Sequence, residues 1–295
     1  MHRYALSIPY TWAADPAFRE AALKSKVRAF EFGCAGDAAP EAYAPVVAAI
    51  AESGLEAASI HVPFGNTPWV PARAAERDAT LAAIRGLMEA WAPLRPPRYT
   101  LHACTELDTH HKGAEAHLNV DRKEQIAATR AFLAEILPDL ERLRTSLNIE
   151  YLPRTCLCNV PEELEEIVDG FPPDRVGICL DVNHASPRTE IMPELIRRLG
   201  PRINTFHLSD CDGVDECHWY PGYGVVDWPA CMAEIRALKR DVLLILEVFK
   251  LPFPEWQKAW HPNTHSQDLA AMEMNVLFLE NAEEMARRRA ALVIP

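Results

Sequence analysis

The stretch VGICLDVNH, residues 176–184, is the segment that best indicates the fold. Its first five residues are small or apolar, which is typical of a buried strand. Asp181 and His184 follow, three residues apart, at the point where the strand breaks into a loop. We therefore expect both side chains to face the carboxyl end of this strand.

Seven other strand-like runs occur along the chain, with helical patterns between them. The eight runs are predicted at residues 4–8, 27–32, 57–62, 98–102, 147–151, 176–181, 203–208 and 242–248. They recur about every 34 residues, which suits βα units. Strands that alternate with helices predict a parallel sheet, and eight units predict a closed barrel rather than an open, doubly wound sheet. We expect an α/β protein, a single-domain (β/α)8 TIM barrel over residues 1–295.

The predicted helices fill the intervals between the strands. They are expected at residues 40–53, 72–91, 121–144, 162–168, 190–199, 228–239 and 266–289. Gly54 is a plausible C-terminal cap of the first of these helices. Pro161 opens the helix over 162–168 at a favoured first-turn position.

Composition excludes several classes of protein. Hydrophobic residues make up 49% and charged residues 24% of the 295 positions, which excludes wholesale disorder. With 30 Lys and Arg against 42 Asp and Glu, the net charge of −12 argues against a general nucleic-acid binder.

No signal peptide and no membrane span are expected. The eight cysteines show no CxxC spacing, so we expect reduced thiols in a cytoplasmic enzyme.

Seven of the eight predicted strands finish with a carboxylate or an imidazole. These residues are Glu31, His61, His102, Glu150, Asp181, His207 and Glu247. Each one alone could be structural, but the active site of a TIM barrel lies at the carboxyl ends of its strands, where all seven would meet. Buried charges are costly unless they are compensated, and a divalent cation bound by carboxylates and neutral imidazoles would compensate all of them.

The segment after the seventh strand is rich in acidic residues. His207 is followed within eleven residues by Asp210, Asp212, Asp215, Glu216 and His218. The glycines of PGYG, residues 221–224, allow a sharp turn and close approach to a ligand. Asp212 and Asp215 are expected to stabilise a solvated turn or a cap.

As an ordered set, these motifs resemble the xylose isomerase-like barrel superfamily, which contains sugar isomerases and epimerases as well as endonuclease IV. The resemblance is carried by SIHVPFG, LHAC, NIEYLPR, CLDVNHA, FHLSDCDG and LILEVF, in this order along nearly the whole chain. No single motif is specific by itself.

The resemblance implies a role for each matching position. The metal ligands of the ketose epimerase branch match Glu150, Asp181, His207 and Glu247, and the two glutamates are also its catalytic acid/base pair. His184 matches a substrate-contacting histidine. Additional metal-ligand positions of endonuclease IV match His61, His102, Glu216 and His218, with Glu216 where that enzyme's D-x-H-x-x-x-G-x-G pattern has Asp. We expect these four residues and His184 to surround the substrate.

The leading hypothesis is a metal-dependent isomerase or epimerase of a small sugar or sugar-like polyol ketone. The metal (manganese, zinc or cobalt, with magnesium possible) would polarise the carbonyl, and Glu150 and Glu247 would transfer protons through an enediolate. A dehydratase of the inosose or dehydroshikimate type is an alternative, and an endonuclease IV-like phosphodiesterase is another. A barrel kept as a binding module is the non-enzymatic alternative.

A homo-oligomer is possible, and the Trp- and His-rich segment 251–265 could shape a pocket or a subunit contact.

Overall fold

The structure, a computed structural model, describes residues 3–34, 39–63, 74–96, 98–103, 122–153, 156–248 and 265–292. Its eight strands pair in chain order, all parallel, and β8 returns to pair with β1, so the sheet is a closed barrel. The strands are β1 (Arg3–Pro9), β2 (Ala29–Gly33), β3 (Glu56–His61), β4 (Arg98–Leu101), β5 (Ser146–Glu150), β6 (Val176–Asp181), β7 (Ile203–Leu208) and β8 (Leu243–Leu246). The predicted TIM barrel is confirmed, and the open sheet is excluded.

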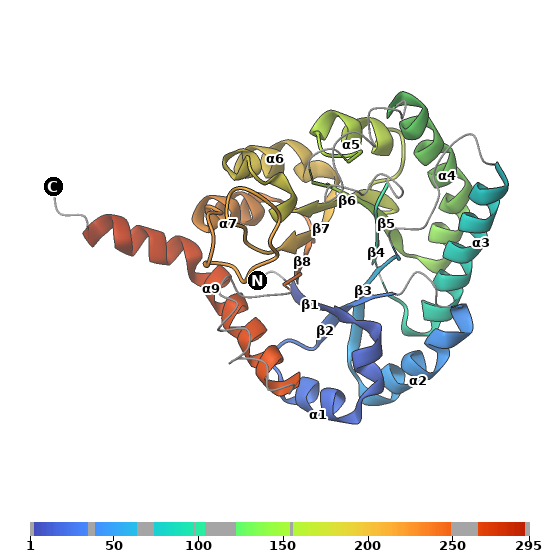
Figure 1. The fold of residues 1–295 in the computed structure, drawn as a ribbon, viewed down its shortest axis with the longest axis horizontal. Helices are drawn as coiled ribbons and strands as arrows, with labels where there is room; N and C mark the ends of the chain where they lie inside the picture. The colour runs from blue at the N-terminus through green and yellow to red at the C-terminus, as the bar shows by residue number, and fades with distance from the viewer. Residues whose placement is uncertain are drawn as a thin grey trace.

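Helices surround the barrel as a ring (Figure 1). They are α1 (Pro16–Lys24), α2 (Ala44–Ser53), α3 (Ala74–Trp91), α4 (Arg122–Leu143), α5 (Pro161–Val168), α6 (Met192–Leu199), α7 (Trp228–Ala237) and α9 (His265–Leu292). Helix α9 packs against both α7 and α1 and so closes the ring, while its C-terminal turns extend beyond it (Figure 1). Of the segment 251–265, expected to shape a pocket or a subunit contact, residues 251–264 lie outside the described residues and His265 begins α9.

Helix α1 was not predicted from the sequence. Its start nevertheless carries a recognisable signal, because Asp15 is the N-cap and its side chain accepts a hydrogen bond of 2.8 Å from the backbone N–H of Ala17. Pro16 occupies the first helical position, where its missing N–H costs nothing. The predicted cap at Gly54 is confirmed by a φ of 76°.

The inside of the barrel is divided between an apolar floor and a polar upper part. The floor is a cluster of small and branched apolar side chains from four neighbouring strands: Ala5, Ala29, Ala58, Leu243 and Ile245. Further toward the carboxyl ends of β2, β3 and β4, the buried polar groups of Glu31, Ser59 and Thr100 replace apolar side chains. The floor closes the barrel to water from below, so chemistry is confined to the carboxyl end.

The seven cysteines in the described part of the chain are all free, which agrees with the expected reduced thiols. Among the described helices, none combines the length and the apolar composition needed to cross a bilayer.

Gly177 on β6 tests how closely the barrel wall packs. An added Cβ would overlap the side chain of Asn204 and approach the carbonyl oxygen of Arg202 to 2.9 Å. Because the carbonyl belongs to the backbone of the neighbouring strand region, we expect Gly177→Ala to lower the free energy of unfolding by about 1–3 kcal/mol. Gly33→Ala is the matched control, since the nearest atom to its added Cβ is 3.7 Å away. Urea unfolding of the two variants measures the difference, and equal stabilities would contradict it.

Candidate metal centre at the carboxyl end of the barrel

The structure brings all nine predicted site residues together at the carboxyl end of the barrel. His61, Glu150 and Asp181 are the last residues of β3, β5 and β6, and His207 is the second-last residue of β7. The others follow strands: His102 comes after β4, His184 lies in the 3-10 helix η5 (Asn183–Ala185), Glu216 and His218 lie between β7 and α7, and Glu247 comes after β8.

Seven of these nine side chains are buried, and Glu216 and His218 are partly buried. Asp181 and His207 have no exposed surface, and Glu150 is 1% exposed. Burying an isolated carboxylate is strongly unfavourable, so each must be paired with a proton, a donor or a cation.

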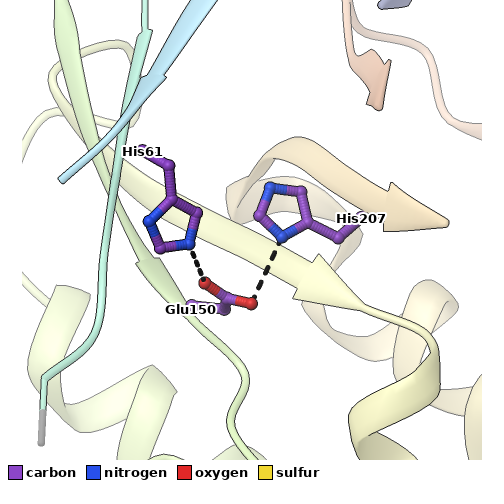
Figure 2. Close-up of side chains that lie close together, drawn as sticks. All are labelled: His61, Glu150 and His207. Carbon is purple, nitrogen blue, oxygen red and sulfur yellow. Dashed lines mark hydrogen bonds and ion pairs between the residues drawn. The ribbon is translucent and has the colours of Figure 1, made fainter. Parts of the chain in front are cut away.

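Glu150 lies at the centre of the cluster (Figure 2). Its Oε2 is 3.3 Å from Nε2 of His61 and 3.0 Å from Nε2 of His102, while its Oε1 is 3.2 Å from Nδ1 of His207. The carboxylate therefore contacts imidazoles from three other strands at once.

Glu150, Asp181, His207 and Glu247 form a compact donor set. One donor atom from each lies within 4.8 Å of the others. Nδ1 of His207 is 3.2 Å from Oε2 of Glu247 and 3.9 Å from Oδ2 of Asp181. Three carboxylates and one imidazole suit manganese, cobalt or zinc, and magnesium less closely because it prefers oxygen ligands alone.

Asp181 is oriented by the backbone that follows it. Its Oδ1 accepts hydrogen bonds from the N–H groups of Asn183 and His184, at 2.7 and 3.2 Å. Its Oδ2 is buried, and no donor among the described residues forms a hydrogen bond with it. One oxygen is thus fixed, and the other faces the donor set, where a ligand oxygen belongs.

Two histidines have their tautomers set by carbonyl groups. Nδ1 of His61 is 2.9 Å from the carbonyl oxygen of Val62, and Nδ1 of His184 is 2.8 Å from that of Tyr151. A carbonyl can only accept, so in the neutral rings Nδ1 carries the hydrogen and Nε2 carries the lone pair. Both lone pairs face carboxylate oxygens. Nε2 of His61 is 3.3 Å from Oε2 of Glu150, and Nε2 of His184 is 3.4 Å from Oε2 of Glu216. Two facing acceptors need a proton or a cation between them.

Two further donor groups share residues with the first. One comprises Asp181, His184 and His218, and the other comprises His61, Glu150 and His207. Because Asp181 and Glu150 belong to both the first set and a second one, the arrangement offers bridging carboxylates for more than one cation.

The loop that carries Glu216 and His218 is held at its base by Asp210, which is fully buried. The Asp210 carboxylate accepts four hydrogen bonds, from the N–H groups of Cys211, Gly222 and Val226 and from the indole of Trp228. Asp210 and Trp219 also pair through their backbones. These bonds make the loop a fixed part of the barrel mouth.

Nδ1 of His218 lies 3.3 Å from the carbonyl oxygen of Glu247 and 3.4 Å from Oγ of Ser209. Its ring meets that of His184 edge to face, with centroids 5.6 Å apart. His218 has a φ of 48°, an uncommon value for a residue other than glycine, which marks a conformation that the surrounding loop imposes.

The buried charges shift the titration of the ligand candidates. Burial opposes the charged form of His207, but the carboxylates around it hold its pKa well above 6.5. Burial and the nearby Glu247 and Glu150 raise the pKa of Asp181 well above 3.8. Burial opposes the ionisation of Glu150, yet His102 and His207 keep its pKa well below 4.5. Protons on His207 and Asp181 therefore compensate part of the negative charge.

The sequence profile described as "Xylose isomerase-like TIM barrel" matches residues 19–273. The chain belongs to this family. No curated protein sequence matches the chain directly.

Solved structures of this barrel superpose over nearly the whole chain. A D-tagatose 3-epimerase-like protein is 18% identical, covers 96% of this chain and 99% of its own, and has a TM-score of 0.69. A 3-keto-D-glucoside 4-epimerase from E. coli is 14% identical, covers 95% of this chain and 100% of its own, and has a TM-score of 0.70. The IolI protein with a bound zinc atom is 16% identical, covers 95% and 98%, and has a TM-score of 0.72. At these identities the likeness shows the fold alone.

The roles of the residues that hold the site in place do not follow from the sequence. Glu31 is predictable only as a strand-end carboxylate, and Asp210 only as part of an acidic loop. A polar residue at an inward position of an apolar strand was the available signal for Glu31. Asp212 stabilises a turn as expected, since its Oδ1 accepts from the N–H groups of Val214 and Asp215 at 2.8 and 2.9 Å.

The stability of the cation-free protein should decrease as the pH rises from 6.5 to about 8. The raised pKa of His207 means that the folded chain keeps a proton that the unfolded chain releases as the pH passes 6.5, and Asp181, whose unfolded carboxyl is already ionised above its usual value of 3.8, adds to the loss with the same sign while it stays protonated. Their stabilisation is fully present below the unfolded pKa and is lost toward the folded pKa, at about 1.4 kcal/mol per pH unit for each proton. Thermal unfolding in the presence of a chelator measures this slope.

The same protein with saturating Mn²⁺ or Zn²⁺ is the control. A cation that replaces these protons binds more tightly as the pH rises, so the slope should flatten or reverse. Stability that is constant or increases with pH in the chelator would contradict the proton assignment.

Proposed function

We propose that the chain is a divalent-metal-dependent isomerase or epimerase of a small sugar or sugar-like polyol ketone. The observation that carries the proposal is the donor set of Glu150, Asp181, His207 and Glu247, whose donor atoms lie within 4.8 Å of one another. Known structures with this fold include a D-tagatose 3-epimerase-like protein and an L-ribulose 3-epimerase, which supports the same class of substrate.

The four residues of this set would hold the cation. When bound, it supplies Lewis acidity to a carbonyl and an adjacent hydroxyl oxygen of the substrate, which acidifies the C–H bond between them. Nδ1 of His207 and Oδ2 of Asp181 are suited to hold the cation. The other nitrogen of His207, Nε2, already contacts Glu31, and the other oxygen of Asp181, Oδ1, already accepts a hydrogen bond from the backbone.

Glu150 and Glu247 would transfer the proton. They belong to strand ends three positions apart in the ring, so their carboxylates approach the centre from different sides. His207 helps to keep the pKa of both below its usual value despite burial, so both are ionised at neutral pH and able to accept a proton. One carboxylate would take the proton from carbon as the enediolate forms, and the other would first take up a proton from solvent and then deliver it to the opposite face.

The remaining candidates would surround the substrate: His61, His102, His184, Glu216 and His218. The Nε2 lone pair of His184 and the carboxylate of Glu216, 3.4 Å apart, are two acceptors to which neighbouring substrate hydroxyls could donate. A small polyhydroxy compound offers several such donors.

Glu150→Gln and Glu247→Gln should each abolish turnover. The amide keeps the shape of the side chain but cannot accept the proton from carbon, and loss of a general acid or base costs about 10²–10⁴-fold in rate. The measurement is interconversion of ketoses such as D-tagatose, D-psicose and L-ribulose, together with deuterium uptake from D2O. Glu20→Gln, an exposed change on α1, is the control. Substantial activity in either site variant would contradict the two-base mechanism.

Product analysis separates an isomerase from a dehydratase. Both begin by removing a proton beside a carbonyl, but a dehydratase then expels a hydroxyl group as water. A product of unchanged mass supports the isomerase, whereas the loss of 18 mass units from a ketone substrate, about one water, supports the dehydratase.

Hydrolysis of a phosphodiester at a site with two or three zinc ions is the second candidate function. The specific observation in its favour is the pair of additional donor groups that share Asp181 and Glu150 with the first set. The net charge of −12 opposes it for a DNA substrate, since gripping duplex DNA needs a basic surface.

The number of metal ions per chain distinguishes these two functions. We expect one Mn²⁺, Co²⁺ or Zn²⁺ per chain by elemental analysis, and the same number in His218→Ala, because His218 lies outside the four-residue set. Two or three zinc ions, with one lost in His218→Ala, would favour hydrolysis instead. A chain that takes up no metal would contradict both functions.

A further inference from the structure

One buried carboxylate in the barrel is not used by the proposed reaction. Glu31 on β2 has no exposed surface. Its Oε2 accepts hydrogen bonds from the hydroxyl groups of Ser59 on β3 and Thr100 on β4, at 2.7 and 3.4 Å. Ser59 is also the residue that pairs with Glu31 across the two strands. One end of the carboxylate is therefore anchored to the barrel wall.

The other oxygen of Glu31 points across the barrel. Oε1 lies 3.1 Å from Nε2 of His207 on β7, an ion-pair contact without hydrogen-bond geometry, and neither atom forms a hydrogen bond with any other described residue. Nδ1, the second nitrogen of the same ring, lies 3.2 Å from both Glu150 and Glu247. The imidazole of His207 thus bridges Glu31 and the candidate metal ligands.

We propose that Glu31 is a positioning residue that fixes His207 with its Nδ1 lone pair toward the cation and so sets the metal affinity of the site. This inference rests on the proposed function, because it requires His207 to be a ligand. Glu31 itself is not a ligand, since its two oxygens are directed at Ser59, Thr100 and the far nitrogen of His207.

The chemistry of the pair explains why a carboxylate is needed here. A carboxylate can only accept, so it keeps the hydrogen of the neutral ring on Nε2 and leaves Nδ1 as the ligand atom. A carboxylate behind a ligand imidazole also increases its basicity and restrains its rotation.

Folding stability alone does not account for Glu31. Glu31 adds a negative charge to a site that already holds excess buried negative charge, and Glu31→Gln removes that charge while its amide oxygen can still accept from Ser59 and Thr100. A cation-free protein should therefore tolerate replacement of Glu31, whereas a cation-loaded protein should not. That contrast separates a positioning role from a merely structural one.

The test compares Glu31→Gln and Glu31→Leu with the wild type. Dissociation constants for Mn²⁺ and Zn²⁺ are measured by competition with a chelating dye, and thermal unfolding is measured in the presence of a chelator. We expect both variants to bind the cations about 10–100-fold more weakly, with an unchanged or higher unfolding temperature without cation. Glu56→Gln is the matched control, because this glutamate starts β3 at the opposite end of the barrel and should leave the affinity unchanged.

Two further measurements connect the effect to His207. In the zinc-loaded protein, two-bond ¹H–¹⁵N NMR should show a proton on Nε2 of His207 that is protected from exchange, and Glu31→Leu should lose that protection. Ser59→Ala should weaken metal binding less than Glu31→Leu, and should add nothing in the Glu31→Leu background, because Ser59 acts through Glu31.

The outcomes distinguish this inference from the proposed function. A wild type that binds Mn²⁺ or Zn²⁺ with an affinity that Glu31→Gln matches within twofold would overturn the role of Glu31 and leave the metal site standing. A wild type that binds neither cation would overturn both. If Glu31→Leu fails to fold without cation, Glu31 has a structural role, and the isosteric Glu31→Gln then decides whether it also sets the affinity.

Discussion

The concentration of buried negative charge at the barrel mouth is the constraint on which the rest of the site depends. Five carboxylates lie among five imidazoles there: Glu31, Glu150, Asp181, Glu216 and Glu247 with His61, His102, His184, His207 and His218. Like charges at such short range in a poorly hydrated place repel strongly, so the folded state requires positive charge among them. Without a cation, the protein meets this requirement by keeping protons on His207 and Asp181, whose pKa values are raised.

The barrel makes this arrangement possible because it separates stability from chemistry. An apolar floor that includes Ala29 and Leu243 excludes water from below, and the ring of helices covers the outside of every strand. Each strand then needs to supply only one or two polar residues at its carboxyl end. The backbone supports these residues in turn: Asn183 and His184 donate to Asp181, and the carbonyl of Tyr151 fixes the ring of His184.

The sequence predicts the residues whose position follows from topology and fails for those whose position follows from packing. Strand ends such as Glu150 and Asp181 could be assigned to one site because parallel strands in a closed barrel must finish together. The contact between Glu31 and His207 could not be predicted, since β2 and β7 are not neighbours and only the diameter and register of the barrel bring them within 3.1 Å. Asp210 is similar, because three of its four donors come from a loop whose path has no periodicity and the fourth is the Trp228 indole at the start of α7. Helix α1 was not predicted, although Asp15 and Pro16 at its start were a local signal for it.

Charge balance also connects the number of cations to the type of reaction. One divalent cation offsets two of the five carboxylate charges, so imidazolium or carboxyl protons must remain nearby, and such protons are what an enzyme that moves hydrogen between carbon atoms requires. Two or three cations would offset four to six charges and displace those protons, which leaves a site suited to activating water rather than to exchanging protons with carbon. Glu150 is the residue at which the two regimes differ most. With one cation, Glu150 would retain imidazole neighbours and act as a base, whereas a second cation held by His61, Glu150 and His207 would draw its other oxygen into ligation and weaken it as a base.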